Sequence, residues 1–125
     1  MAAQPKRIIV GFDGTEGAHR ALGAAVQLMG YGSALTVVTV GPEGDSGGRD
    51  VLAGAREWLL SRLVTATYVH RLGEPAAELV AAATELEADL VVVGRRGKTN
   101  GARGEPGSVS ADVVRLAPCD VLVVG

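Results

Sequence analysis

The sequence predicts an α/β fold in which a doubly wound, five-stranded parallel sheet is covered by helices on both faces. Short runs of β-branched and aliphatic residues alternate along the chain with longer segments whose apolar residues recur at helical spacing. The short runs contain few polar residues, which is typical of parallel strands that are buried on both faces. Strands that alternate with helices in this way form βαβ units, so the architecture expected is Rossmann-like. We expect residues 1–125 to form a single domain.

The first half of the chain predicts two strands, each followed by a helix. Residues 8–12 form a β-branched run that ends at a turn-forming Asp-Gly pair, and apolar residues then recur at helical spacing over 15–29. A second strand is expected over 35–40, closed by Gly-Pro. The polar and glycine-rich residues 43–50 have the composition of a loop, and residues 51–63 predict an amphipathic helix.

The second half of the chain predicts three further strands and two helices. Residues 65–71 alternate and are rich in β formers, which favours a strand near an edge of the sheet. A Gly-Glu-Pro sequence starts the next helix, with proline in its first turn, and its apolar residues continue to 86. A strand without a polar face follows at 89–94. The last two elements expected are a helix over 108–116 and a strand over 121–124.

Composition and charge exclude several classes of partner. The formal net charge of −2 provides no basic field for nucleic acid or for an anionic membrane surface. The uninterrupted apolar runs are far shorter than the roughly 20 residues that span a bilayer, and residues 1–7 contain no apolar core of a secretory signal. Cys119 is the single cysteine, so an internal disulfide is impossible. We therefore expect a soluble, cytoplasmic protein without a nucleic-acid or membrane partner.

Glycines gather at two places where predicted strands end. Residues 11–14, Gly-Phe-Asp-Gly, follow the first strand, and residues 94–97, Gly-Arg-Arg-Gly, follow the fourth. In open sheets of this kind, ligands bind beyond the carboxyl ends of the strands, where the strand order reverses. Glycines let backbone N–H groups approach an anion, and the Gly-Ser pair at 107–108 opens a helix whose N–H groups can face the same anion. The segment 94–108 therefore predicts a phosphate-binding loop.

The spacing of this loop resembles a family signature. Within residues 94–108, two glycines separated by two residues are followed, after nine more residues, by Gly-Ser. This pattern is similar to the signature of the ATP-binding universal stress proteins. The resemblance extends to the first strand with its terminal Asp13, to Gly-Glu-Pro-Ala at 73–76 and to the helix and strand over 108–124, so it covers essentially the whole chain. Residues 41–51 form a shorter segment than many relatives have at this point.

The resemblance implies the strand order 3-2-1-4-5 and a site for ATP. In such a site, Gly11, Phe12 and the backbone near Val40 border the adenine. Asp13 lies beside the ribose or, alternatively, helps to position a phosphate-bound Mg²⁺ ion. The phosphates are held by residues of the glycine-spaced loop and of the helix that follows it, namely Gly94, Arg96, Gly97, Gly107, Ser108, Val109 and Ser110.

Several of these features have a simpler structural interpretation. Glycine-rich loops are often only connections, their basic residues often only face solvent, and Asp13 alone can cap the following helix. His19 and His70 are isolated and are expected to be structural, and Cys119 is expected to fill apolar space next to a strand. Asp13 and Glu105 are the only candidates for a general base near the γ-phosphate, which argues against a dedicated enzyme.

The function expected from the sequence is that of a nucleotide-dependent stress-response or regulatory protein. ATP would order the glycine-spaced loop and change a dimer surface that an unknown protein partner recognises. In the strand order of the family, Val121, Leu122, Val123 and Val124 form an apolar edge strand, which favours a homodimer. Two alternatives remain at this point, a nucleotide-independent dimeric interaction module of the same fold and a weak ATPase.

Overall fold

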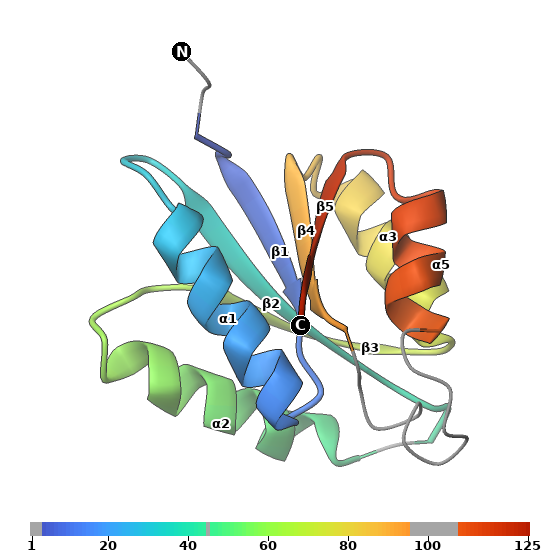
Figure 1. The fold of residues 1–125 in the computed structure, drawn as a ribbon. Coiled ribbons are helices and arrows are strands. Elements are labelled where there is room, and N and C mark those ends of the chain that lie inside the picture. Colours follow the sequence, from blue (N-terminus) through green and yellow to red (C-terminus); the bar gives the residue numbers. More distant parts are fainter. Residues whose placement is uncertain (1–3, 45, 96–107) are drawn as a thin grey trace.

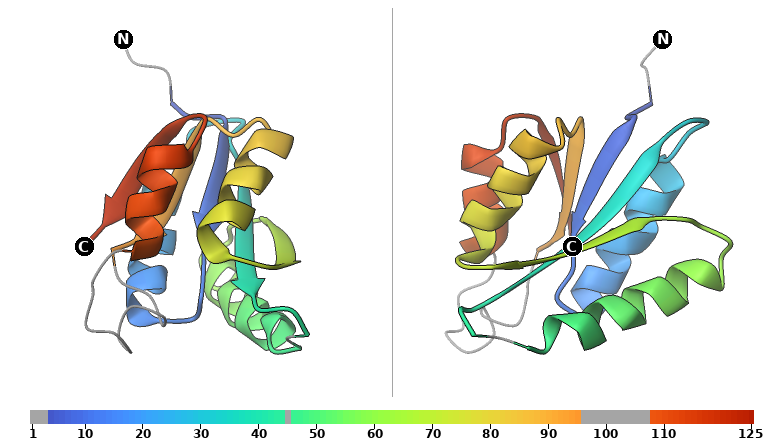
Figure 2. Two further views of the ribbon diagram at one scale, coloured as in Figure 1. Left: turned by 90° about the vertical axis from the view of Figure 1, so that its right-hand side faces the viewer. Right: turned by 180° about the vertical axis from the view of Figure 1, so that it is seen from behind.

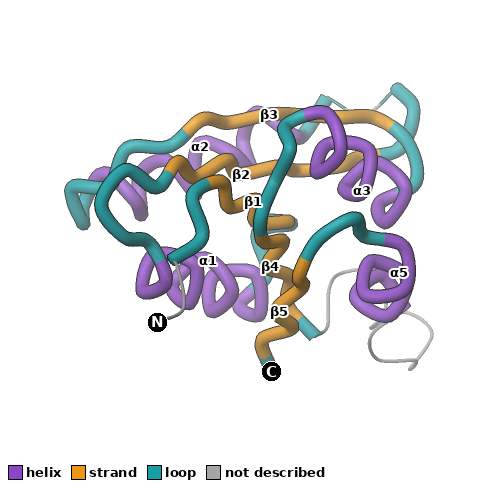
Figure 3. The backbone as a smooth tube through the Cα atoms, turned by 90° about the horizontal axis from the view of Figure 1, so that it is seen from above, coloured by secondary structure: helices purple, strands orange, loops and turns teal. Residues whose placement is uncertain are grey.

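The computed structural model describes residues 4–44, 46–95 and 108–125, and in these ranges five strands alternate with four helices (Figure 1). In chain order the elements are β1 (Arg7–Gly11), α1 (Glu16–Leu28), β2 (Ala34–Gly41), α2 (Gly48–Leu60), β3 (Thr67–Leu72), α3 (Pro75–Glu85), β4 (Leu90–Gly94), α5 (Ser108–Leu116) and β5 (Asp120–Val124). All neighbouring strands are parallel. The order is β3-β2-β1-β4-β5, which confirms the prediction and is visible in Figure 3.

The sheet lies between two layers of helices, α1 and α2 on one face and α3 and α5 on the other (Figure 2). Strand β1 shows how the alternation of side chains builds both cores. Ile8 and Val10 point into the core under α1 and α2, and Ile9 points into the core under α3 and α5. The prediction of a doubly wound sheet is therefore confirmed. Across the described ranges, no helix combines the length and apolar character that a membrane span requires.

Helix α2 differs most from its predicted bounds, because it begins at Gly48 and ends at Leu60. The residues before Val51 that have a loop composition include the first turn of this helix. A Cβ atom on Gly48 would overlap the imidazole of His70 on β3, so glycine lets the helix start against the sheet. Leu63 has a φ of 59°, in the left-handed region, and the chain has left the helix before this point.

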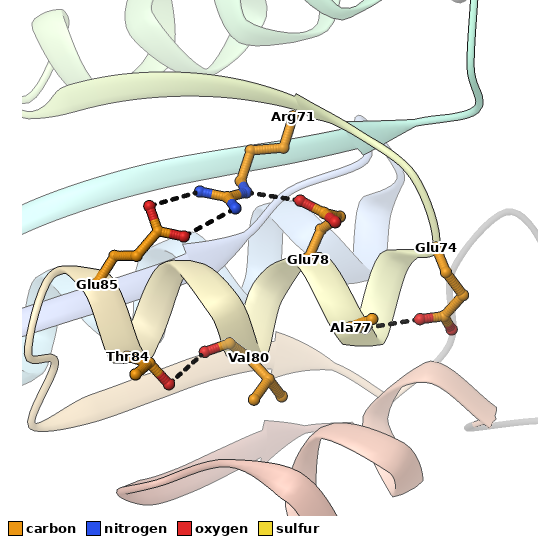
Figure 4. Close-up of polar contacts among 7 residues, drawn as sticks. All are labelled: Arg71, Glu74, Ala77, Glu78, Val80, Thr84 and Glu85. Atoms are coloured by element: carbon orange, nitrogen blue, oxygen red, sulfur yellow. Dashed lines mark hydrogen bonds and ion pairs between the residues drawn. The ribbon is translucent and has the colours of Figure 1, made fainter.

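Strand β3 is an edge strand, and charged side chains join it to α3. The Arg71 guanidinium donates from Nε to Glu78 Oε1 at 2.9 Å and from Nη2 to Glu85 Oε2 at 3.0 Å. Figure 4 shows Arg71 between these two carboxylates, which lie about two turns apart on α3. Glu74 caps the same helix by accepting from the Ala77 N–H at 2.6 Å. These contacts fix the start and the length of α3 along the edge of the sheet.

Candidate functional site

Three described segments that carry predicted site residues lie at the carboxyl end of the sheet (Figure 1): the loop after β1, the end of β4 and the start of α5. Strands β1 and β4 are neighbours although α1, β2, α2, β3 and α3 separate them in the chain, so the strand order reverses between them. Figure 1 shows the loop after β1, the end of β4 and the first turn of α5 at the same end of the sheet, the lower end in that view. The fold therefore places these segments where ligands bind in open α/β sheets.

The end of β1 is closely packed. The Phe12 side chain is only 3% exposed and contacts the His19 ring edge-on, with 4.9 Å between the ring centroids. The Phe12 N–H donates to the Val38 carbonyl at 2.9 Å, which holds the chain against β2 beyond the last residue of β1. A Cβ atom on Gly11 would lie 2.9 Å from Leu79 Cδ1. The Phe12 ring therefore belongs to the core.

Asp13 lies in the turn between β1 and α1, and Thr15 determines its conformation. The Thr15 N–H and the Thr15 hydroxyl both donate to Asp13 Oδ1, at 3.0 and 2.5 Å. The residue that caps α1 is Thr15, whose Oγ1 accepts from the Ala18 N–H at 3.2 Å. The alternative in which Asp13 is itself the cap therefore does not describe this turn. Sequence reasoning missed Thr15, although a threonine just before a helical apolar pattern is a recognised cap signal.

Gly94, at the end of β4, has a packing role in the structure. A Cβ atom on Gly94 would lie 3.0 Å from the Gly17 carbonyl oxygen in the first turn of α1. Since this neighbour is backbone, it cannot turn away as a side chain could. Glycine at position 94 thus lets α1 approach β4, a reason that is independent of any phosphate. Gly17, the partner in this contact, was also missed by sequence reasoning.

The remaining predicted residues are divided between the core and the loop. Val40 and Val109 pack against the core under α3 and α5, and Ser110 is 5% exposed, with its hydroxyl 3.4 Å from the Arg95 carbonyl oxygen. Helix α5 begins at Ser108, as the Gly-Ser signal predicts. Three predicted site residues lie outside the described residues: Arg96, Gly97 and Gly107.

The titratable groups of the described residues do not gather into a candidate metal site. No cluster of three or more His, Cys, Asp or Glu side chains suited to a metal ion occurs in the described ranges. Cys119 is half-buried against the core under α3 and α5, and burial, followed by the nearby Asp120 and Asp89 carboxylates, raises the pKa of its thiol. A raised pKa disfavours the thiolate, so this environment suits the apolar role expected of Cys119.

A shallow cavity of about 350 Å³ lies at the amino ends of the strands, the end of the sheet opposite the predicted site. No site was predicted there. It is lined by the starts of β1 and β2 and by the turn after α3: Arg7, Ile8, Ile9, Ala34, Thr36, Glu85, Leu86, Glu87 and Ala88. The charged side chains in this lining already form ion pairs, one of them within the lining itself. Arg7 pairs with Glu87 at 3.3 Å, and Glu85 accepts from Arg71. The cavity therefore does not coincide with the predicted nucleotide site.

Comparison with known proteins identifies the family. A model described as "Universal stress protein family" matches residues 5–125. The chain belongs to this family. As a universal stress protein it is 30% identical to universal stress protein YxiE of Bacillus subtilis over 144 aligned residues, which cover 94% of this chain and 97% of that protein. The family resemblance inferred from the spacing of the glycine-rich loop is thereby confirmed.

Solved structures of universal stress proteins have the same fold. A universal stress protein in complex with cAMP matches with a TM-score of 0.80 and 28% identity, over 98% of each chain. The universal stress protein UspA from Lactobacillus plantarum matches with a TM-score of 0.79 and 23% identity, over 99% of this chain and 100% of its own. The second match supports the fold alone, and the first also provides a related protein with a bound adenine nucleotide.

Proposed function

We propose that this universal stress protein binds an adenine nucleotide, with ATP as its ligand, at the carboxyl edge of the sheet. One observation carries the proposal: the glycine-spaced segment 94–108 connects the end of β4 to the first residue of α5, at the point where the strand order reverses. A helix start offers free N–H groups and the positive end of a dipole to phosphate oxygens. The cAMP complex of a protein that is 28% identical supports an adenine nucleotide as the class of ligand.

Within this proposal, the segments at the edge divide the nucleotide between them. The backbone of Gly11 and Phe12 and that near Val40 border the adenine, and Asp13 lies beside the ribose. The glycine-spaced loop and the first turn of α5 hold the phosphates, with Mg²⁺ as a companion ion of the triphosphate. Among these residues the Phe12 ring packs in the core, so it is not the part of this segment that would contact the adenine.

The output proposed for this binding is regulatory. Nucleotide binding would order the glycine-spaced loop and alter a surface near β5, through which two copies of the chain pair. Catalysis is not part of the proposal, because among the described residues Asp13 is the one candidate base at this edge and its Oδ1 already accepts two bonds from Thr15. A phosphate-release assay with ATP and Mg²⁺ tests this point, and turnover above the background rate would restore the ATPase alternative.

Isothermal titration calorimetry with ATP, AMP and cAMP tests the proposed site. Gly107→Val places a branched side chain where backbone must approach phosphate, so we expect ATP binding to be lost. The matched control is Gly54→Ala on α2, a glycine around which no atom lies within 4 Å of an added Cβ, and it should bind as the wild type does. Equal dissociation constants for Gly107→Val and the wild type would mean that this loop does not bind the phosphates. A wild type that binds none of the three nucleotides would favour the nucleotide-independent interaction module.

A further inference from the structure

The hydroxyl of Thr15 takes part in two hydrogen bonds with different purposes. It donates to Asp13 Oδ1 at 2.5 Å, and it accepts from the Ala18 N–H at 3.2 Å as the cap of α1. The backbone N–H of Thr15 donates to the same Asp13 oxygen at 3.0 Å. Because both bonds from Thr15 end on Oδ1, they determine the plane of the carboxylate and the direction in which its second oxygen points. The Thr15 side chain thus caps α1 and also provides one of the two bonds from Thr15 that orient Asp13, the other being that of the backbone N–H.

The turn that carries Thr15 is itself supported by the core. The Thr15 carbonyl accepts from the His19 N–H at 3.0 Å, in the first turn of α1, and lies 3.2 Å from His19 Nδ1. The His19 ring contacts Phe12 edge-on and faces Trp58 of α2 at 6.4 Å between centroids. Packed rings on both sides of His19 hold the first turn of α1 in place. Thr15 is therefore connected to a rigid part of the molecule, which makes it able to fix a neighbouring side chain.

We propose that Thr15 is a positioning residue that makes the nucleotide site selective for ribose hydroxyl groups. This inference rests on the proposed function, in which Asp13 lies beside the ribose. An Asp13 carboxylate that is already oriented accepts a hydrogen bond from a ribose hydroxyl without first losing rotamer freedom. A nucleotide without these hydroxyls leaves the oriented carboxylate without that bond, and sites built to hydrogen-bond a hydroxyl reject ligands that lack it. Thr15 would thus act on affinity through Asp13, without touching the ligand.

The measurement is a ratio of two dissociation constants, that for 2′,3′-dideoxy-ATP divided by that for ATP. We expect the wild-type ratio to be about tenfold or more, as for a hydrogen bond to a charged acceptor. Because both ligands carry the same base and triphosphate, a general change in the site alters both constants and leaves the ratio unchanged. The ratio therefore reports on the ribose contact, and thermal unfolding of each variant reports separately on the cap of α1.

Three substitutions of Thr15 separate positioning from capping. Thr15→Ser keeps the donor and the cap, Thr15→Ala removes both, and Thr15→Asp keeps an acceptor for the cap but has no hydroxyl to donate to Asp13. The ratio should stay high in Thr15→Ser and fall severalfold in the other two variants, which keep only the backbone N–H bond from residue 15 to Asp13. Melting temperature should fall in Thr15→Ala through loss of the cap, and in Thr15→Asp through repulsion between the carboxylates at positions 13 and 15. Thr84→Ala, which removes an exposed hydroxyl bonded to the Val80 carbonyl on α3, should leave the ratio as in the wild type.

Asp13→Ala provides the test of the route through which Thr15 acts. The ratio in Asp13→Ala should be about one, and adding Thr15→Ala should not lower it further, because Thr15 acts only through Asp13. A high ratio retained in Thr15→Asp or in Thr15→Ala would overturn the inference, as would a wild type that binds both nucleotides equally. In each of these cases ATP binding, and with it the proposed function, would stand. A wild type that binds neither nucleotide would overturn both.

Discussion

The two edge strands of the sheet, β3 and β5, carry different kinds of side chain. On β3, Arg71 is held by two carboxylates of α3, and the Arg56 guanidinium lies over the Tyr68 ring, 4.7 Å from its centroid. On β5, four consecutive aliphatic residues follow Asp120. The Val123 side chain among them is still 37% exposed in the single chain.

This difference indicates how each edge meets solvent. Charged side chains on an edge strand oppose pairing with a strand of another chain, and an apolar edge strand without such charges favours pairing. At β3, the carboxylates that pair with Arg71 come from α3 of the same chain. At β5 the charged residue lies only at the start of the strand, and the remainder is suited to a second copy. The comparison supports placing the proposed dimer at β5 and not at β3.

The largest effect expected from this comparison is the loss of the dimer in Val123→Lys. A lysine in the apolar part of β5 puts two like charges close together across a two-fold axis and desolvates both. Sedimentation velocity should then show a dimeric wild type and a monomeric variant. Thr67→Lys is the matched control, since it places the same charge on an exposed position of the other edge strand. A Val123→Lys protein that remains dimeric, or a Thr67→Lys protein that dissociates, would place the interface elsewhere.

A smaller effect is expected when the charged contacts between β3 and α3 are removed. Arg71→Met deletes the bonds to Glu78 and Glu85 and leaves two carboxylates without their shared cation, so the free energy of unfolding should fall by about 1–2 kcal/mol. Arg115→Met is the control, because its pair with Asp112 on α5 is more exposed and should contribute at most about 0.5 kcal/mol. Urea unfolding measures both. Equal losses in the two variants would mean that the Arg71 contacts are no more than an ordinary surface pair.

The contrast between local and long-range contacts also explains what could be predicted from the sequence. The strands and helices, the parallel sheet and the edge position of β3 follow from periodicities and turn residues that lie within each segment. The early start of α2 depends on Gly48 meeting His70, a residue of the next strand, and no local pattern contains that contact. The type of each element could therefore be predicted from the sequence, but the bounds of α2 could not.

The candidate site shows the same division. The loop residues were predicted from glycine spacing, which is visible in the sequence, and the structure shows that β1 and β4 are neighbours whose carboxyl ends lie at the same end of the sheet. Thr15 was missed although its cap signal is local, and its bonds to Asp13 require coordinates. Gly94 was predicted to bind phosphate from its spacing, and the structure shows that the approach of Gly17 also requires glycine at this position. Spacing alone cannot separate these two causes, because both require an absent side chain.

The smallest effect concerns an exposed charge next to the start of β4. Asp89 Oδ2 accepts from the N–H groups of Arg7 and Lys6, both at 2.9 Å, and these bonds hold the pKa of Asp89 below its ordinary value. A carboxyl group whose pKa is lower in the folded state stabilises the fold above its unfolded pKa of about 3.9, and this stabilisation disappears as the pH falls through the folded value. Asp89→Asn should therefore lower the urea midpoint at pH 7, and the difference from wild type should shrink toward pH 3. A difference that is constant with pH would instead mean that Asp89→Asn acts through altered hydrogen-bond geometry. The charge of Asp89 would then contribute as little to the free energy of unfolding as the exposed ion pair of Arg115.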